Sequence, residues 1–310
     1  MSYSLDNVIA FFTANHDASL QIDQMAKNVL LYMNSMSFCQ RSFIWEDLQL
    51  FLAFSNQEGM PQNRNPFELI NPKGQFPLVL TCEHASFSLP QEYQNLGLSS
   101  TEAQRHIGWD IGARSVVASL AQILDAPAVC SSYSRLLVDC NRDLNDHDLI
   151  VRESDRTVIP GNREVSTEEC QKRIDLCYRP YHEAIDSVLA GKKDHPPTLL
   201  SIHSFTPILG KKERPFDLGV LFDRYEDLAQ ELGKRLGHNG HHVRYNEPYS
   251  GYDGLIFSAR SHGERNGLAY IELEINNSLI ATTEGAQHIA AVINRVCCEL
   301  FPQHDSKEQA

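Results

Sequence analysis

The amino-acid sequence predicts an α/β protein built around a mixed, largely parallel sheet. From Pro77 onward, short apolar runs alternate with amphipathic segments of helical length, which is the pattern of βαβ units. The 310 residues are 42% hydrophobic and 22% charged, so the chain has enough apolar side chains to bury a substantial core. We therefore expect a globular main domain over residues 67–310, preceded by an appendage.

The appendage, residues 1–66, is predicted to be helical. Leu5, Val8, Ile9 and Phe12 fall on one face of a helix, and similar spacing recurs further along this stretch. No cluster of chemically reactive side chains occurs in it. We interpret it as a helical N-terminal extension, which could also serve as an interface.

In the main domain, apolar runs and helical periodicity assign the elements in chain order. The predicted strands are residues 78–82, 128–131, 198–203, 218–223, 242–245 and 268–275. The predicted helices are residues 104–125, 167–190, 225–237 and 284–300. The second helix follows the capping-box pattern Ser166-x-x-Glu169.

Charge and composition narrow the possible partners. The chain has 40 acidic residues against 27 Lys and Arg, a formal net charge of -13, which disfavours binding to a nucleic acid or an anionic membrane. No run approaches the ~20 consecutive apolar residues of a membrane span, and we see no signal for export. The eight cysteines form no C-x-x-C pair and are interpreted as reduced thiols. We expect a cytoplasmic protein that binds a small polar molecule.

Polar side chains follow three of the predicted strands at their carboxyl ends. Ligands of open α/β sheets collect at this edge, so these side chains are expected to lie close together. They are Glu83 and His84, His203 and Ser204, and Glu274 and Asn276.

Two of these residues, His84 and His203, are candidate metal ligands. A lone histidine at a strand end is more often a turn residue, but two of them at neighbouring strand ends favour a metal site, because neutral imidazole binds zinc well. A zinc hydrolase needs a third protein ligand and an open position for water. Asp110 or Glu83 could complete the site, and His106, four residues before Asp110, could ligate or orient.

Residues 134–143 place Arg135, Asn141 and Arg142 in and around a short apolar segment. An arginine can hold a carboxylate through a bidentate pair of hydrogen bonds, and an Asn amide can orient a carbonyl oxygen. Judged alone, the segment could equally supply surface salt bridges. It is therefore a candidate substrate-binding segment.

The predicted strand 268–275 carries Glu272 and Glu274 on one face. A carboxylate on a buried strand costs free energy unless it is paired or has a chemical role. We assign Glu274, nearest the strand end, as the general base and expect Glu272 to pair with an arginine. No G-x-S-x-G elbow or glycine-rich phosphate loop is present, which argues against a serine hydrolase or a nucleotide cofactor.

Taken together, these motifs resemble the N-formylglutamate amidohydrolase family between about Phe67 and Leu300. The matching elements are Cys82-Glu83-His84-Ala85-Ser86, His106-x-x-x-Asp110-x-Gly112-Ala113, Ser134-Arg135 with Asp139-x-Asn141-Arg142, Tyr181-His182, His203-Ser204-Phe205 and Glu274-Ile275-Asn276. The resemblance implies a three-layer α/β/α fold similar to that of the zinc carboxypeptidases and aspartoacylases.

The resemblance also implies a role for each candidate residue. Zn(II) would be held by His84, Asp110 and His203, where Asp110 replaces the carboxylate of the carboxypeptidase H-x-x-E motif, which this chain lacks. Glu274 and Arg142 would be catalytic. Substrate would be bound by Arg135, Asn141, Arg142, Ser204 and Asn276.

The expected reaction is hydrolysis of the amide bond of an N-acyl amino acid. The substrate expected before others is N-formyl-L-glutamate, which would give formate and glutamate. Two alternatives stay open on the sequence. One is a zinc peptidase or deacylase acting on another N-acyl amino acid or peptide. The other is a non-catalytic member of the family that binds a metal or ligand.

Overall fold

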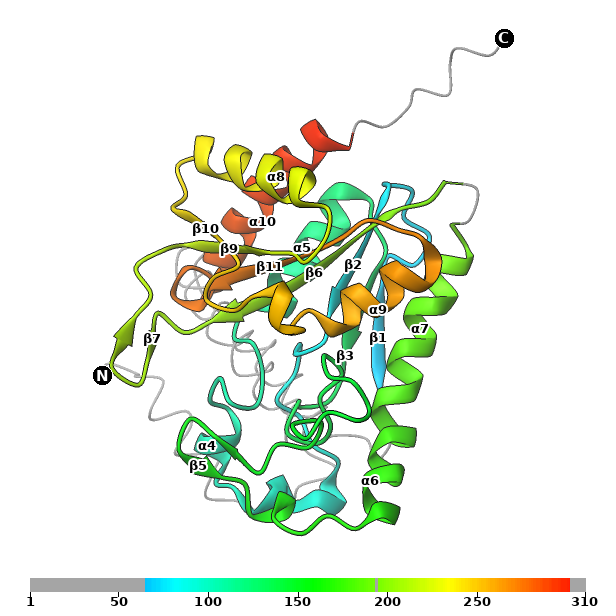
Figure 1. The fold of residues 1–310 in the computed structure, drawn as a ribbon, viewed down its shortest axis with the longest axis vertical. Coiled ribbons are helices and arrows are strands. Elements are labelled where there is room, and N and C mark those ends of the chain that lie inside the picture. Colours follow the sequence, from blue (N-terminus) through cyan, green and yellow to red (C-terminus); the bar gives the residue numbers. More distant parts are fainter. Residues whose placement is uncertain (1–64, 193–194, 302–310) are drawn as a thin grey trace, which may run out of the picture. The chain divides into compact units, whose positions relative to one another are not determined.

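The computed structural model describes residues 65–192 and 195–301, and its centre is a seven-stranded sheet (Figure 1). The strand order is β1-β3-β2-β6-β11-β9-β10. The strands are β1 (Phe67–Ile70), β2 (Leu78–Cys82), β3 (Ala128–Ser131), β6 (Thr198–Phe205), β9 (Leu218–Leu221), β10 (Val243–Tyr245) and β11 (Tyr270–Asn276).

The sheet is mixed, with a parallel centre. Strands β3, β2, β6 and β11 pair in parallel, and β9 pairs in parallel with β10. Strand β1 pairs antiparallel with β3, and β9 pairs antiparallel with β11. The prediction of a mixed, largely parallel sheet is confirmed.

Helices cover both faces of this sheet, which gives three layers (Figure 1). Helices α5 (Ala113–Leu124), α8 (Glu226–His238) and α10 (Thr283–Leu300) pack on one face through a large aliphatic cluster. Helices α7 (Arg179–Ala190) and α9 (Phe257–Asn266) lie on the other face, over a second cluster that includes Tyr181 and Tyr270. The predicted α/β/α arrangement is confirmed.

The first half of the predicted helix 104–125 is wrong. Residues 104–112 form turns, and α5 begins only at Ala113. Gly112 stops the helix because its backbone is left-handed, with φ of 83°, and a Cβ there would lie 2.2 Å from the carbonyl oxygen of Ile280. The turns that replace the helix place Asp110 beside β2, where its backbone N–H donates to the carbonyl of His84 at 2.9 Å.

The predicted helix 167–190 consists of α6 (Thr167–Arg173), a π-helical turn η3 (Ile174–Tyr178) and α7. The Ser166 hydroxyl caps it by accepting from the Glu169 N–H at 3.2 Å, whereas the Glu169 carboxylate turns to Arg173 instead of completing a capping box. Helices 225–237 and 284–300 are present as α8 and α10, and all six predicted strands are present.

Several short elements had no clear signal in the sequence. Besides β1 and α9, they are the hairpins β4 (Glu153–Ser154) with β5 (Thr157–Val158) and β7 (Ile208–Leu209) with β8 (Lys212–Glu213), the helix α4 (Ser100–Ala103), and the 3-10 turns η1 (Gln91–Gly97), η2 (Pro160–Asn162), η4 (Gly251–Asp253) and η5 (Asn277–Leu279). The hairpin β7–β8 follows β6 directly along the chain.

The predicted helical extension over residues 1–66 falls almost wholly outside the described residues and stays a prediction. Within the described part of the chain, no helix has the length and apolar character needed to cross a membrane. The seven cysteines described are all free thiols.

Candidate functional site

Alternation along three adjacent strands sends the polar side chains to one face of the sheet. On β6 and β11, alternate aliphatic residues such as Leu200, Ile202 and Leu273 pack under α5 and α10. The residues between them therefore face α7 and α9. The parallel register sets Glu274 beside His203 and Glu272 beside Ser201. The strand-end convergence predicted from the sequence therefore arises from pairing of β2, β6 and β11 side by side.

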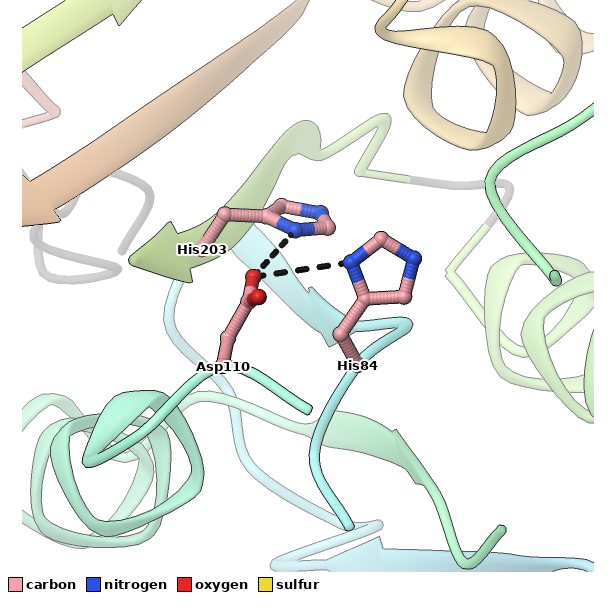
Figure 2. Close-up of side chains that lie close together, drawn as sticks. All are labelled: His84, Asp110 and His203. Carbon is pink, nitrogen blue, oxygen red and sulfur yellow. Dashed lines mark hydrogen bonds and ion pairs between the residues drawn. The ribbon is translucent and has the colours of Figure 1, made fainter. Parts of the chain in front are cut away.

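Three side chains converge at this edge: His84 after β2, His203 on β6 and Asp110 from the turn before α5 (Figure 2). Asp110 Oδ2 lies 2.8 Å from His203 Nδ1 and 3.5 Å from His84 Nδ1. Ligand atoms on a tetrahedral zinc ion, each 2.0–2.1 Å from the metal, lie about 3.3 Å from one another. The donor types of this trio, and ligand atoms that all lie within 4.8 Å of one another, could hold a metal ion.

The second nitrogen of each imidazole is held by another carboxylate. His84 Nε2 lies 2.7 Å from Asp139 Oδ1, and His203 Nε2 lies 2.9 Å from Glu83 Oε2. Carboxylates in this position fix the tautomer of metal-binding histidines and leave the opposite nitrogen to ligate. By this geometry Glu83 orients His203, while Asp110 stands where a third ligand belongs.

Of the described residues, five buried carboxyl groups gather at the site around a single arginine. Five carboxylates, those of Glu83, Asp110, Asp139, Glu272 and Glu274, are at most 8% exposed. Arg135 is the one cation within 4.0 Å of any of them among the described Arg and Lys side chains, and it lies 2.8 Å from Asp110 Oδ1. Buried like charges are costly unless a counter-charge is present, so the site suits a divalent cation.

Burial and local contacts divide these carboxylates into two groups. Burial raises the pKa of Glu83, Asp110 and Asp139, but hydrogen bonds and charge from His203, Arg135 and His84 outweigh it and hold all three below their ordinary values. Burial dominates for Glu272 and Glu274, whose pKa values are raised. Burial lowers the pKa of His203, yet the surrounding carboxylates, Glu272 first, raise it overall.

Glu274 has the properties of a proton-transfer group. It is 4% exposed, lines the inner cavity, and its Oε2 has no hydrogen-bond partner among the described residues. Its neighbour Glu272 accepts from Asn141 Nδ2 at 3.2 Å and lies 3.5 Å from His203 Nε2. The expected arginine partner of Glu272 was wrong, because Asn141 and His203 occupy that place.

Arg135 faces the metal-ligand trio rather than open solvent. Its guanidinium donates to the backbone carbonyls of Ile107, His106 and Trp109, and its Nη1 lies 3.2 Å from His84 Nδ1. A metal ion on His84 Nδ1 would displace this last contact, since the nitrogen has one lone pair. These contacts make Arg135 a positioning residue for Asp110 and do not support its predicted role in holding a substrate carboxylate.

Arg142 and Asn141 differ in how fully their polar groups are used. Asn141 is saturated, donating to Glu272 and to the Leu255 carbonyl and accepting from the Ser258 N–H at 2.9 Å. Among the described residues, Arg142 donates only to the Asn141 carbonyl at 3.3 Å, and its closest carboxylate oxygen, on Asp146, is 3.9 Å away. Arg142 is therefore the arginine at the site that is free to bind an anion.

Ser204 and Asn276 have different positions. Ser204 lines the inner cavity, with its hydroxyl donating to the Ile111 carbonyl at 3.0 Å and its N–H to Asp110. Asn276 does not line it. The Asn276 amide donates to the Phe216 carbonyl at 3.1 Å and its oxygen caps η5, so the geometry does not support a role in substrate binding.

His106 lies at the edge of the trio and lines both cavities of the site. Its Nδ1 is 3.7 Å from Asp110 Oδ1, and burial together with the charge of Arg135 lowers its pKa to about 4. Its Nδ1 is buried without a hydrogen-bond partner among the described residues, so no hydrogen bond fixes a role for His106 in ligating a metal or in orienting Asp110.

Several contributing residues had no assigned role in the sequence analysis. Asp139 holds His84, and Ser201 and Tyr181 donate to Glu83 at 2.7 and 2.9 Å. Arg214, 6% exposed, lies 5.2 Å from the ring centre of Tyr249. Asp139 stands in a segment already singled out for its arginines, whereas Tyr181 and Arg214 come from distant parts of the chain that only the fold brings close.

Two adjoining cavities open onto these residues. The inner one, of about 140 Å³, is lined by the trio together with Glu272, Glu274, Ser204 and Asn141. The outer one, of about 500 Å³, shares four wall residues with it, and these are His106, Arg135, Arg142 and Tyr249. The two cavities therefore adjoin at this shared wall.

Comparison with known proteins agrees with this geometry. The family model for N-formylglutamate amidohydrolase matches residues 76–281, and no curated protein matches the chain. The crystal structure of gene product Atu2144 from Agrobacterium tumefaciens is 30% identical, covering 76% of this chain and 95% of that one, with a TM-score of 0.73. N-formylglutamate amidohydrolase from Ralstonia eutropha JMP134 is 20% identical and shares the fold, covering 76% of this chain and 97% of that one, with a TM-score of 0.62. Because the family model spans well over half of the 310 residues, the chain belongs to the N-formylglutamate amidohydrolase family.

Proposed function

We propose that this protein is a zinc-dependent hydrolase that cleaves the amide bond of an N-acyl amino acid, with N-formyl-L-glutamate as the reference substrate. One observation carries the proposal. His84 and His203 each present Nδ1 to Asp110 while a carboxylate holds Nε2. This arrangement prepares two imidazoles and a carboxylate to bind one cation.

In this proposal, His84, Asp110 and His203 hold the metal. When bound there, zinc lowers the pKa of a water molecule towards ~7 and polarises the amide oxygen. Glu83 and Asp139 keep the two imidazoles oriented, and Arg135 keeps Asp110 in place. None of these three supporting residues needs to touch the substrate.

Glu274 is proposed to move the proton. Its raised pKa, caused by burial, brings proton exchange closer to neutral pH. The carboxylate takes a proton from the attacking water and returns it to the leaving nitrogen. Arg142, at the junction of the two cavities, binds the substrate carboxylate and so aligns the amide for attack.

The cytoplasm is the proposed location. The buried thiols of Cys140 and Cys177 share a hydrogen bond, with their sulfur atoms 3.9 Å apart, and form no disulfide. Reduced pairs at this distance are expected in a compartment that keeps thiols reduced.

The test combines metal content with formate release from N-formyl-L-glutamate, comparing wild type, His203→Ala and the control His288→Ala. His288 is an exposed residue of α10. We expect about one zinc per chain in wild type and control, and loss of both metal and activity in His203→Ala. Zinc without formate release would keep the metal site and redirect the search to other N-acyl compounds. Absence of metal from every protein would refute the proposal.

A further inference from the structure

We infer that the preferred substrate of this site is a short-chain N-acyl derivative, such as N-formyl, of an amino acid with an apolar side chain and a single carboxylate. The inference rests on the proposed function and narrows it. By this reasoning N-formyl-L-glutamate is accepted less well than N-formyl-L-leucine. Three features of the two cavities lead to this conclusion: size, wall chemistry and charge.

The inner cavity limits the acyl group. Its volume of about 140 Å³ must hold the reacting amide as well as the attacking water, which leaves space for one or two carbons of acyl chain. Its walls include the carboxylates of Glu272 and Glu274. A longer acyl chain has no apolar surface to contact there, and an acidic one would meet like charge.

The outer cavity, in contrast, is large and has an aliphatic wall. Within its volume of about 500 Å³, the side chains of five aliphatic residues gather on the walls, and these are Ile107, Ile111, Val151, Ile208 and Leu209. Ile208 and Leu209, on hairpin β7–β8, are 56% and 43% exposed. Covering exposed aliphatic surface lowers the free energy of the complex. An apolar substrate side chain in this cavity is therefore favoured over a charged one.

The arginines in these walls can bind one substrate carboxylate, because two of the three are already paired with an acidic residue. Arg105 pairs with Asp155 at 2.6 Å and Arg135 with Asp110 at 2.8 Å, so both guanidiniums already have a partner. Arg142 has no carboxylate closer than 3.9 Å in the part of the chain that the structure describes. It lies at the junction, where the α-carboxylate would lie if the acyl group points inward and the side chain outward.

Among the described residues that line the cavities, the second carboxylate of N-formylglutamate finds no equivalent partner. Arg214 is close by but lines neither cavity, since it lies beneath the ring of Tyr249. The remaining charged groups of the outer wall are acidic, namely Asp139, Asp148 and the paired Asp155. An uncompensated carboxylate placed among them is disfavoured by desolvation and by repulsion.

The inference is tested by measuring kcat/KM of the zinc-loaded full-length enzyme for the N-formyl derivatives of L-leucine, L-glutamate and glycine. We expect the leucine compound to be hydrolysed at least tenfold more efficiently than the glutamate compound. Ile208→Ser and Leu209→Ser should raise KM for the leucine compound several-fold and leave the glycine compound unchanged. Ile123→Ser, at a 51% exposed isoleucine of α5 away from the cavities, is the matched control.

Binding to the Glu274→Gln variant, measured by calorimetry, separates the inference from the proposed reaction. Tighter binding of N-formyl-L-leucine than of N-formyl-L-glutamate, weakened by Leu209→Ser, supports the inference even if wild type hydrolyses neither compound. Equal or tighter binding of the glutamate compound overturns it while leaving the amidohydrolase proposal intact. If neither compound binds, the inference is refuted as well.

Discussion

His203 lies between two carboxylates, with Asp110 at Nδ1 and Glu83 at Nε2. Glu83 can therefore affect metal binding without touching the metal, by holding the His203 imidazole. Glu83→Gln keeps the size of the side chain but removes the charge that fixes the imidazole. We expect zinc affinity to fall about 10- to 100-fold, the usual effect of losing such a partner.

Zinc affinity of Glu83→Gln can be measured by competition with a chelator of known affinity. Glu68→Gln is the control, because Glu68 forms an exposed ion pair with Arg114 away from the site. Unchanged affinity in Glu83→Gln would show that the contact with His203 has no role in metal binding.

Substituting Glu274 distinguishes a general base from a metal ligand, because only the loss of a ligand should lower the zinc content. Glu274→Gln should lower kcat by about 10²- to 10⁴-fold because the amide cannot take a proton, with zinc content unchanged. Asp110→Asn should instead lose zinc along with activity. Because Glu274 can also approach His203 and Glu272 in a second possible metal cluster, loss of zinc from Glu274→Gln would reassign it as a ligand.

At this scale the sequence predicts residue types better than contacts. His84, His203 and Glu274 stand at the ends of apolar runs, and this local pattern suffices to bring them to one edge of the sheet. The partners Asp139 and Tyr181 could not be assigned, because their distances from His84 and Glu83 depend on how whole loops and helices pack. The contacts of Arg135 could not be assigned for the same reason, since the turn 104–112 supplies the carbonyls to which it donates, and its role in binding substrate stays a prediction.

Among the elements, the turn before α5 depends on one glycine. Gly112→Ala would place a Cβ 2.2 Å from the Ile280 carbonyl oxygen at a φ of 83°. We expect a loss of about 2–4 kcal/mol in the free energy of unfolding, from strain and from steric overlap. Urea denaturation measures it.

The control for Gly112→Ala is Gly237→Ala. Gly237 lies within α8, and a Cβ there would have no atom within 4 Å. Alanine favours the helix, so this variant should be neutral or up to about 1 kcal/mol more stable. Equal effects of the two substitutions would contradict the assignment of Gly112 as the residue that ends the turn.

Helices α7 and α9 meet through a half-buried histidine, His182, and a buried one, His262, with His182 Nδ1 2.8 Å from His262 Nε2. Burial and the charge of His262 lower the pKa of His182 from 6.5 to about 3. The unfolded chain therefore binds the proton first, and stability is lost as the pH falls from about 6.5 towards 3. His182→Asn cannot titrate, so its stability should decline less over pH 7 to 5 than that of wild type.

Urea unfolding at half-unit intervals of pH measures this difference, with His288→Asn as the exposed control. Parallel curves for wild type and His182→Asn would exclude His182 as a source of acid sensitivity. The sequence shows the Tyr181-His182 pair but not its partner. The helix that carries His262 was not predicted, because its ten residues lack a clear apolar face.

For the whole molecule, the cluster of buried carboxyl groups predicts that stability depends on the metal. A ligand that binds only the folded state stabilises it by about 2.7 kcal/mol at a concentration one hundred times its Kd. We expect the melting temperature to rise with added zinc and fall with a chelator. In His203→Ala the melting temperature should respond to neither, as thermal unfolding by circular dichroism can show.

The fold as a whole was more predictable than the site. Alternating apolar runs and helical periodicity depend on short stretches of chain, which is why all six predicted strands and three of the four helices are present close to the predicted bounds. The edge strand β1 and the hairpins are short, and their formation depends on the neighbour with which they pair. Strand order and cavity size are tertiary properties that local patterns do not contain.

Alternate residues of strand β11 have two different roles. Ile271, Leu273 and Ile275 pack into the aliphatic core, while Glu272 and Glu274 face the site. Mutational tolerance should therefore have a period of two, with exchange among aliphatic residues accepted at the first set and almost none at the second. Inserting or deleting a single residue in β11 would exchange the two sets, so this strand can evolve by substitution but not by a change in length.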